Sequence, residues 1–241
     1  AGMPLYSLLG GKAREGVTVY RHADGGCLEE VKECISRYIE EGYRHIRCHM
    51  GTYGGNFDGR RQQMVKPEGA PEGAYFHPKM YMDSVIRLFE QVRKDFGWEL
   101  EVMHDVHERL SLADTLAFTK ELEPFKLFFL EDSLAPDQVG YYKYMREQTA
   151  VPFAMGELFT NPAEWKTIIQ NQWIDFIRVH LSDIGGITPA VKLAHFCDAY
   201  GVRTAWNGPN DLSPIGMCAQ MHLDLNSHNF GIQEFSGFTQ E

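Results

Sequence analysis

The chain has 241 residues, of which 44% are hydrophobic and 23% are charged, as is usual for a globular protein with one large α/β domain. Its net charge of −10 argues against a nucleic-acid partner, because phosphate binding requires a positive surface. Five cysteines without CxxC spacing predict reduced thiols in a cytoplasmic protein, and no apolar run is long enough to predict a membrane span.

Short apolar runs alternate with helical patterns along almost the whole chain. We predict strands at 17–22, 45–50, 101–106, 125–131, 151–156, 176–181, 203–207 and 230–234. We predict helices between them at 28–41, 79–96, 111–122, 137–148, 161–171, 187–200 and 212–223. This order of strands and helices predicts an α/β fold, a TIM-type (β/α)8 barrel that lacks its last helix.

The ends of the chain and one long connection depart from this alternation. The opening AGMPLYSLLGGK resembles the tail of a preceding element, so we expect residues 1–16 to be that tail and 17–241 to be the barrel domain of a longer chain. Residues 51–78 are rich in glycine and proline and form an unusually long connection after the second strand. Connections of this length are usually functional lids or disordered segments.

Three acidic residues, Asp105, Glu131 and Glu157, end three successive predicted strands at intervals of 26 residues. Because the carboxyl ends of parallel strands share one rim, we expect these carboxylates to converge there. Crowded carboxylates stay ionised when they share a cation, and hard oxygen ligands favour Mg²⁺. Asp132 has the opposite parity to Glu131, so we expect it to face away from the site.

Candidate groups for proton transfer lie on the same predicted rim. His107 follows Asp105 by two residues and faces the same way if the strand continues, so it is a candidate general acid or base. Arg47 is unusual in an apolar strand, and Tyr53 follows it by six residues. A guanidinium close to a phenol lowers the pKa of the phenol, which would let Tyr53 abstract a proton.

Further polar residues end other predicted strands. These residues are His22, Arg178 and Glu234. We expect each of them either to contact a hydroxylated substrate or, equally, to take part in a buried ion pair of the barrel. Asn207 and Asp211 bracket a Gly-Pro turn, where Asp211 is also a good candidate for a helix N-cap.

At these residues the chain resembles the enolase superfamily and, within it, the D-mannonate dehydratase family. The resemblance rests on the segments HDVH, FLED, GELF, IRVH, GPNDLSP and NFGIQEF. It implies a capping α+β domain on a modified TIM barrel, with one Mg²⁺ held by Asp105, Glu131 and Glu157. It also implies a proton-abstracting Tyr53 supported by Arg47 and a proton-donating His107. Substrate contacts are implied for His22, Arg178, Asp211 and Glu234, and a homo-oligomer is expected.

The resemblance implies a Mg²⁺-dependent dehydration of a sugar acid, D-mannonate or a related aldonate such as D-gluconate, to a 2-keto-3-deoxy acid. The α-proton is removed and an enediolate forms. Where the family usually has His, however, this chain has Asn207, which can bind a hydroxyl but cannot carry a proton. The alternatives are therefore a catalytically degenerate member that binds a sugar acid or regulates without turnover, and an epimerase or racemase on the same scaffold.

Overall fold

The computed structural model describes residues 2–51, 69, 76–209 and 212–237. These residues form two compact units. Unit 1 contains residues 2–21, 135–147 and 152–237, and unit 2 contains residues 22–134 and 148–151, as far as each range is described. Strand β1 (Val19–Gly25) begins in unit 1 and ends in unit 2.

The strands of unit 2 are parallel and follow the chain order β1, β2, β3, β4. They comprise β2 (His45–Met50), β3 (Glu101–Asp105) and β4 (Leu130–Glu131). Arg47 of β2 lies opposite Met103 of β3, and Asp105 lies opposite Glu131 of β4. This register brings the last residues of β3 and β4 side by side at the carboxyl ends of the strands.

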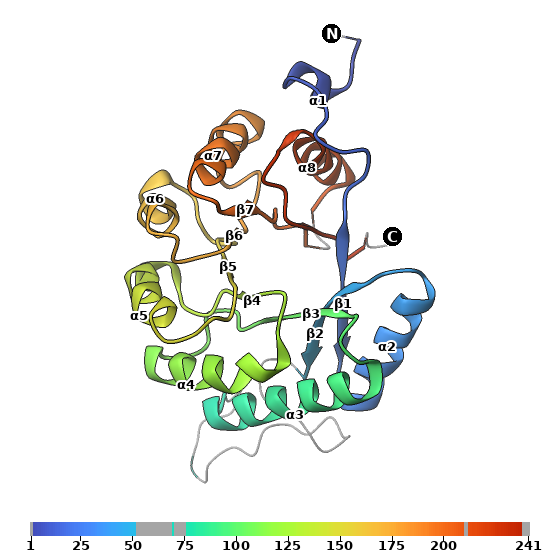
Figure 1. Ribbon diagram of the computed structural model, residues 1–241, viewed down its shortest axis with the longest axis vertical. Helices are drawn as coiled ribbons and strands as arrows, with labels where there is room; N and C mark the ends of the chain where they lie inside the picture. Colours follow the sequence, from blue (N-terminus) through green and yellow to red (C-terminus); the bar gives the residue numbers. More distant parts are fainter. Residues whose placement is uncertain (1, 52–68, 70–75, 210–211, 238–241) are drawn as a thin grey trace. The chain divides into compact units, whose positions relative to one another are not determined.

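Helices alternate with these strands: α2 (Leu28–Glu40), α3 (Pro78–Phe96), α4 (Leu112–Leu122) and the short 3-10 helix η1 (Glu123–Phe125). Helices α2 and α3 pack against β2, and α3 also packs against α4 (Figure 1). Their start sites follow local chemistry. The His77 side chain accepts a hydrogen bond from the Met80 amide at the start of α3, and Ser111 accepts one from Asp114 at the start of α4.

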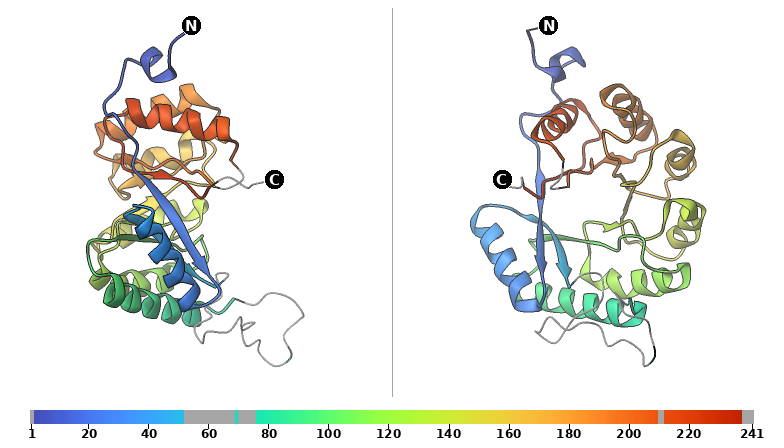
Figure 2. Two further views of the ribbon diagram at one scale, coloured as in Figure 1. Left: turned by 90° about the vertical axis from the view of Figure 1, so that its right-hand side faces the viewer. Right: turned by 180° about the vertical axis from the view of Figure 1, so that it is seen from behind.

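Unit 1 contains the parallel strands β5 (Phe153–Met155), β6 (Phe176–Ile177) and β7 (Arg203–Thr204), and β8 (Gln233–Glu234), which pairs with the first residues of β1. Its helices are α1 (Leu5–Leu8), η2 (Pro136–Tyr141), α5 (Tyr142–Arg146), α6 (Pro162–Gln170), α7 (Ile187–Ala199) and α8 (Pro214–Asn226). Helix α1 lies beside α8, where the ring centroids of Tyr6 and His222 are 5.2 Å apart (Figures 1 and 2).

The predicted alternation of strands and helices is confirmed, but several elements differ in extent. The predicted strand 125–131 shortens to β4; Phe125 belongs to η1, and Lys126 ends that turn with a left-handed backbone, φ 49°. The predicted strands 176–181, 203–207 and 230–234 shorten to β6, β7 and β8. The predicted helix 137–148 divides into η2 and α5. Within the described residues, no helix is both long and apolar enough to cross a membrane.

Two predictions about organisation are not tested by this structure. The division into a tail at 1–16 and a barrel domain at 17–241 stays a prediction. Most of the expected rim connection 51–78 lies outside the described residues.

Candidate active site

A cluster of three buried carboxylates lies at the carboxyl ends of β3 and β4 in unit 2. One side-chain oxygen from each of Asp105, Glu131 and Asp132 lies within 4.8 Å of the others. The three side chains are almost completely shielded from solvent. Part of the predicted metal site is therefore assembled by the register of two neighbouring strands.

Asp132 is a correction to the sequence analysis. Simple alternation along a strand placed its side chain on the face opposite Glu131, whereas the structure places it in the carboxylate cluster. The cause is the backbone: Asp132 has a positive φ of 37°, so the chain has already left the extended conformation. The alternation of side chains between the two faces of the strand therefore does not continue past the end of β4.

Cationic and N–H groups of unit 2 contact Asp105. The His107 amide donates to Oδ1 over 2.8 Å, and Nδ1 of His107 lies 3.3 Å from Oδ2. Arg47 donates to the same Oδ2 over 3.3 Å. Burial raises the pKa of the Asp105 carboxyl, but the hydrogen bond from His107 and the positive charge of Arg47 outweigh it and hold the pKa well below its usual range. Asp105 is therefore ionised at neutral pH.

Arg47 and His107 reach this carboxylate from different elements. Arg47 comes from β2, is 12% exposed, and also lies 3.7 Å from Asp24 of β1. His107 follows the end of β3 with a left-handed backbone, φ 56°, so the predicted continuation of the strand does not occur. Its side chain is 42% exposed and contacts Asp105.

His104, which precedes Asp105 on β3, forms hydrogen bonds to two other elements. Burial lowers the pKa of this histidine to about 4, so the ring is neutral at neutral pH. Nδ1 lies 2.9 Å from the Cys48 carbonyl oxygen, which can only accept, so Nδ1 carries the proton. Nε2 must then accept the hydrogen bond from the Tyr81 hydroxyl, 2.7 Å away. These two bonds link α3, β2 and β3.

The structure describes one of three other predicted residues. His22 lies on β1 with its Nε2 atom buried. Tyr53 and Asp211 lie outside the described residues, so their predicted roles remain predictions.

A second buried polar cluster lies at the ends of β6, β7 and β8 in unit 1. Arg178 is fully buried and donates to Oε2 of Glu234 over 2.9 Å. The Gly208 amide donates to the same oxygen over 2.7 Å, and Arg178 also donates to Oδ1 of Asn207 over 3.3 Å. The structure thus confirms that an ion pair exists here, while leaving substrate contact open as a second role.

The side-chain amide of Asn207 has a defined orientation. Because a guanidinium can only donate, the atom facing Arg178 must be the amide oxygen. The Nδ2 atom is then directed elsewhere; it is buried and has no hydrogen-bond partner among the described residues. A buried donor of this kind is suited to an oxygen of a ligand.

Glu157, the third predicted metal ligand, belongs to unit 1 and follows β5. It is partly buried and lines a cavity of about 670 Å³. The other lining residues are Leu158, His180, Ser182, Asp183, Pro209, Leu212 and Ser213. The preceding Gly156 has φ 135°, and a Cβ there would lie 3.0 Å from the Phe159 ring, so this tight turn after β5 favours glycine.

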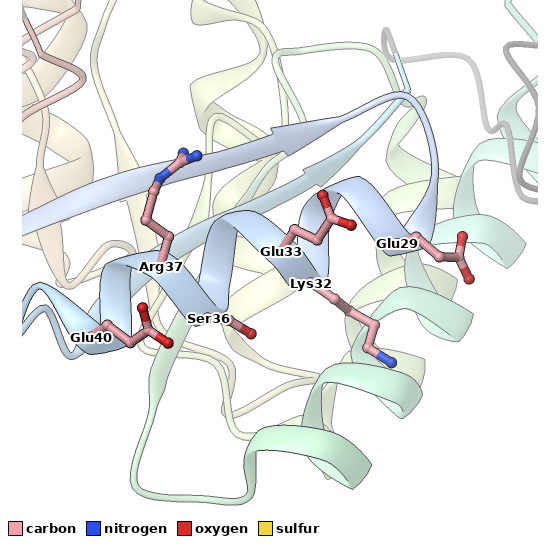
Figure 3. A pocket seen from close by; sticks show the side chains of 6 residues that line it. All are labelled: Glu29, Lys32, Glu33, Ser36, Arg37 and Glu40. Carbon is pink, nitrogen blue, oxygen red and sulfur yellow. The ribbon is translucent and has the colours of Figure 1, made fainter.

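A different hollow of about 460 Å³ runs along the outer face of α2. Figure 3 shows the six side chains that line it, all of them from this one helix: Glu29, Lys32, Glu33, Ser36, Arg37 and Glu40. Lys32 also forms an ion pair with Asp95 of α3, with the charged atoms 2.5 Å apart. The mixed charges indicate a solvated helix face, and none of the predicted functional residues lies there.

The family model described as "Enolase C-terminal domain-like" matches residues 30–240. The chain belongs to this family. A crystal structure of an enolase from Pantoea ananatis, solved with bound D-gluconate and Mg, matches with a TM-score of 0.91 and 47% identity, over 99% of this chain and 61% of that one. The predicted α/β fold class, that of an enolase-like barrel domain, is thereby confirmed.

Relatives of this enolase-like chain are named as D-galactonate dehydratase family members. One from Musicola paradisiaca is 48% identical over 98% of this chain, and one from Paenibacillus sp. is 45% identical over all of it. The chain spans about 60% of the length of both relatives. The enolase superfamily assignment is confirmed, and the finer assignment to D-mannonate dehydratases stays a prediction.

Three residues that lie beside the predicted ones were not predicted from the sequence. Asp24 lies near Arg47, Asp132 belongs to the carboxylate cluster, and His180 lines the cavity beside Glu157. A signal for His180 was present, because it follows Arg178 by two residues and so has the same parity along the predicted strand.

Proposed function

We propose that this chain carries the active site of a Mg²⁺-dependent acid-sugar dehydratase, a hydro-lyase. The observation that carries the proposal is the buried Asp105–Glu131–Asp132 cluster with Arg47 and His107 bonded to Asp105. The D-gluconate and Mg bound to the Pantoea ananatis enolase, and the dehydratase family names of the relatives, support it.

The residues present fit a magnesium ion. Three buried carboxylates have oxygens within 4.8 Å of one another. Carboxylate oxygens are hard ligands, which Mg²⁺ prefers. We assign the ion to Asp105, Glu131 and Glu157, with Asp132 as a further carboxylate beside it. When bound, Mg²⁺ supplies positive charge that stabilises the negative charge developing on the substrate carboxylate as the α-proton leaves.

His107 is the proposed proton donor to the departing β-hydroxyl. Asp105 engages its Nδ1 atom, which fixes the orientation of the ring. Its partly exposed side chain allows access from solvent for reprotonation. Loss of the α-proton and of the β-hydroxyl as water converts the aldonate into the enol of a 2-keto-3-deoxy acid.

Tyr53 is the proposed base, on the strength of the family resemblance. Arg47 supports this role because it places a guanidinium on β2, six residues before Tyr53 in the chain. A nearby positive charge favours the phenolate form that proton abstraction requires.

Substrate binding is assigned to His22, Arg178, Asn207, Asp211 and Glu234. The buried Asn207 amide supports a role in selecting among aldonates by binding and not by catalysis. Its Nδ2 atom donates a hydrogen bond but transfers no proton. We propose D-mannonate or a related aldonate such as D-gluconate as substrate, and a homo-oligomeric cytoplasmic enzyme.

The test is a screen of aldonates with Mg²⁺ and with EDTA, measuring 2-keto-3-deoxy acid. We expect product only with the metal. We expect Glu131→Gln to lower kcat/KM at least about 100-fold and to weaken Mg²⁺ binding, because it removes one charge from the ligand set. Glu147→Gln, at an exposed position, is the matched control. Mg²⁺ binding without product from any aldonate would overturn the proposal.

A catalytically degenerate sugar-acid-binding protein is the second candidate, and Asn207 is the observation that favours it. If Asn207→His restores or increases dehydration, the chain is a weakened dehydratase. If the wild type binds an aldonate without turnover and Asn207→His changes nothing, the binding role is correct. Solvent deuterium in recovered substrate of inverted configuration would instead identify an epimerase.

A further inference from the structure

The cavity beside Glu157 contains a hydrogen-bonded chain of three side chains in a segment, residues 180–183, that follows β6. His180, Ser182 and Asp183 all line this cavity of about 670 Å³ within unit 1. Nδ1 of His180 lies 2.7 Å from Oγ of Ser182, and that hydroxyl donates to Oδ1 of Asp183 over 3.1 Å.

The direction of these bonds fixes the proton on the imidazole. A serine hydroxyl has one proton, and here that proton is directed to the Asp183 carboxylate, which can only accept when ionised. Ser182 must therefore accept from His180, so Nδ1 of His180 carries the ring proton. In the neutral ring the other nitrogen, Nε2, then has a free lone pair. Within the described part of the chain, no donor is bonded to it.

The described lining of the cavity is rich in acceptors and contains neither lysine nor arginine. Glu157 and Asp183 contribute carboxylates. The hydroxyl of Ser213 already accepts a hydrogen bond from the Gly216 amide at the start of α8. An acceptor-rich wall disfavours the carboxylate of a ligand and favours groups that donate, such as the hydroxyls of a polyol chain.

We propose that His180 is a specificity-determining residue whose Nε2 atom accepts a hydrogen bond from a hydroxyl of the sugar acid. Ser182 and Asp183 are positioning residues that hold the imidazole in the Nδ1–H tautomer. The cavity thus binds the hydroxylated tail of the substrate. This inference rests on the proposed function, because it takes the ligand to be a polyhydroxy acid.

The first test needs no ligand. Imidazole ¹⁵N NMR, with the His180 signals assigned from His180→Gln, reports which nitrogen carries the proton. We expect the Nδ1–H tautomer in the wild type and a mixture of tautomers in Ser182→Ala. A wild-type ring protonated at Nε2 alone would overturn the inference, whatever the activity.

The second test uses two variants that imitate different ring nitrogens. His180→Asn keeps a donor toward Ser182 and loses the distal acceptor, whereas the longer His180→Gln can place its carbonyl oxygen near the former Nε2 position. We expect His180→Asn to raise KM for D-gluconate about tenfold and His180→Gln to raise it less. His195→Asn, at an exposed position on α7, is the matched control.

Deoxy analogues separate binding from a general effect on folding. For the aldonate that lacks the contacting hydroxyl, His180→Asn and the wild type should bind with equal Kd, because the lost bond no longer exists in either complex. A tenfold loss that is the same for every deoxy analogue would contradict a hydroxyl contact.

Failure of this inference is distinguishable from failure of the proposed function. If the wild type converts an aldonate and His180→Asn has the same KM, the role of His180 is wrong and the dehydratase proposal stands. If the wild type neither binds nor converts any aldonate, the proposed function fails and the role of His180 in that substrate fails with it.

Discussion

Two fully buried aspartates, one in each unit, have opposite surroundings. Asp105 at the end of β3 accepts hydrogen bonds from His107 and Arg47, and its pKa lies well below the usual range. Asp224 on α8 has no hydrogen-bond partner for either carboxyl oxygen among the described residues. Burial raises its pKa well above the usual range, and the positive charge of Arg14 and the Trp206 indole counteract this only in part.

The comparison shows that burial alone does not decide the charge of a carboxyl group. Desolvation disfavours both anions, and only nearby donors and cations reverse the sign of the shift. An ionised buried acid beside other acids is suited to binding a cation, whereas a buried acid with a raised pKa is suited to packing in its neutral form. Asp105 and Asp224 are therefore suited to different roles, although both are buried.

The largest effect is expected at Glu234, a third buried acid, through its partner Arg178. If cationic partners keep buried acids stable in this protein, Arg178→Met leaves an uncompensated carboxylate and should lower the free energy of unfolding by roughly 3–5 kcal/mol. Urea denaturation monitored by circular dichroism measures this loss.

Two further variants sharpen this result. Arg178→Met combined with Glu234→Met removes both charges and should recover much of the stability, since a buried pair can be replaced by apolar groups at little cost. Lys12→Met breaks the exposed pair with Glu15 and should leave the unfolding midpoint almost unchanged, because solvent screens an exposed ion pair. Equal losses of stability at the buried pair and at the exposed pair would contradict the conclusion that a buried acid depends on its cationic partner.

A smaller effect is expected at Tyr81, which supports the strand that carries Asp105. Tyr81→Phe removes the donor to Nε2 of His104 and leaves that buried acceptor unsatisfied, which should cost about 1–2 kcal/mol of unfolding free energy. Tyr144→Phe, at an exposed position of α5, is the control and should be neutral. Thermal unfolding of both variants would reveal any difference, and identical midpoints would mean that the bond to His104 adds no stability.

Much of the fold was predictable because periodicity reports burial directly. Helix α2 has an apolar face, and α6 also has a clear start signal: the Asn161 side chain accepts from the Ala163 amide while Glu164 accepts from the Asn161 amide. Strand lengths were less predictable. The run 125–131 is largely apolar, yet Phe125 belongs to η1, Lys126 has a left-handed backbone, and the strand comprises only the last two residues.

The site was predictable where it depends on strand ends and not where it depends on turns. Asp105 and Glu131 meet because parallel register carries them to one edge, which their spacing already indicated. Asp132 and His107 depend on positive φ angles that no side-chain pattern reveals. The proton order in the His180–Ser182–Asp183 chain depends on three-dimensional contacts that spacing alone does not give.

The smallest effect near pH 4 is expected at Asp224, where the charge state itself is under test. Because its folded-state pKa is raised, the unfolded chain loses the proton first as pH rises, so this group lowers stability progressively from about pH 4 upward until the folded-state pKa is passed. Asn is close in shape to the protonated acid, so Asp224→Asn should differ from the wild type by less than about 1 kcal/mol near pH 4. Above that pH the variant should become the more stable protein. Unfolding midpoints from about pH 4 to pH 8 test this, with the exposed Asp137→Asn as control, which should follow the wild type. Parallel curves for Asp224→Asn and the wild type would show that Asp224 is ionised in the folded protein, and the contrast with Asp105 would then be lost.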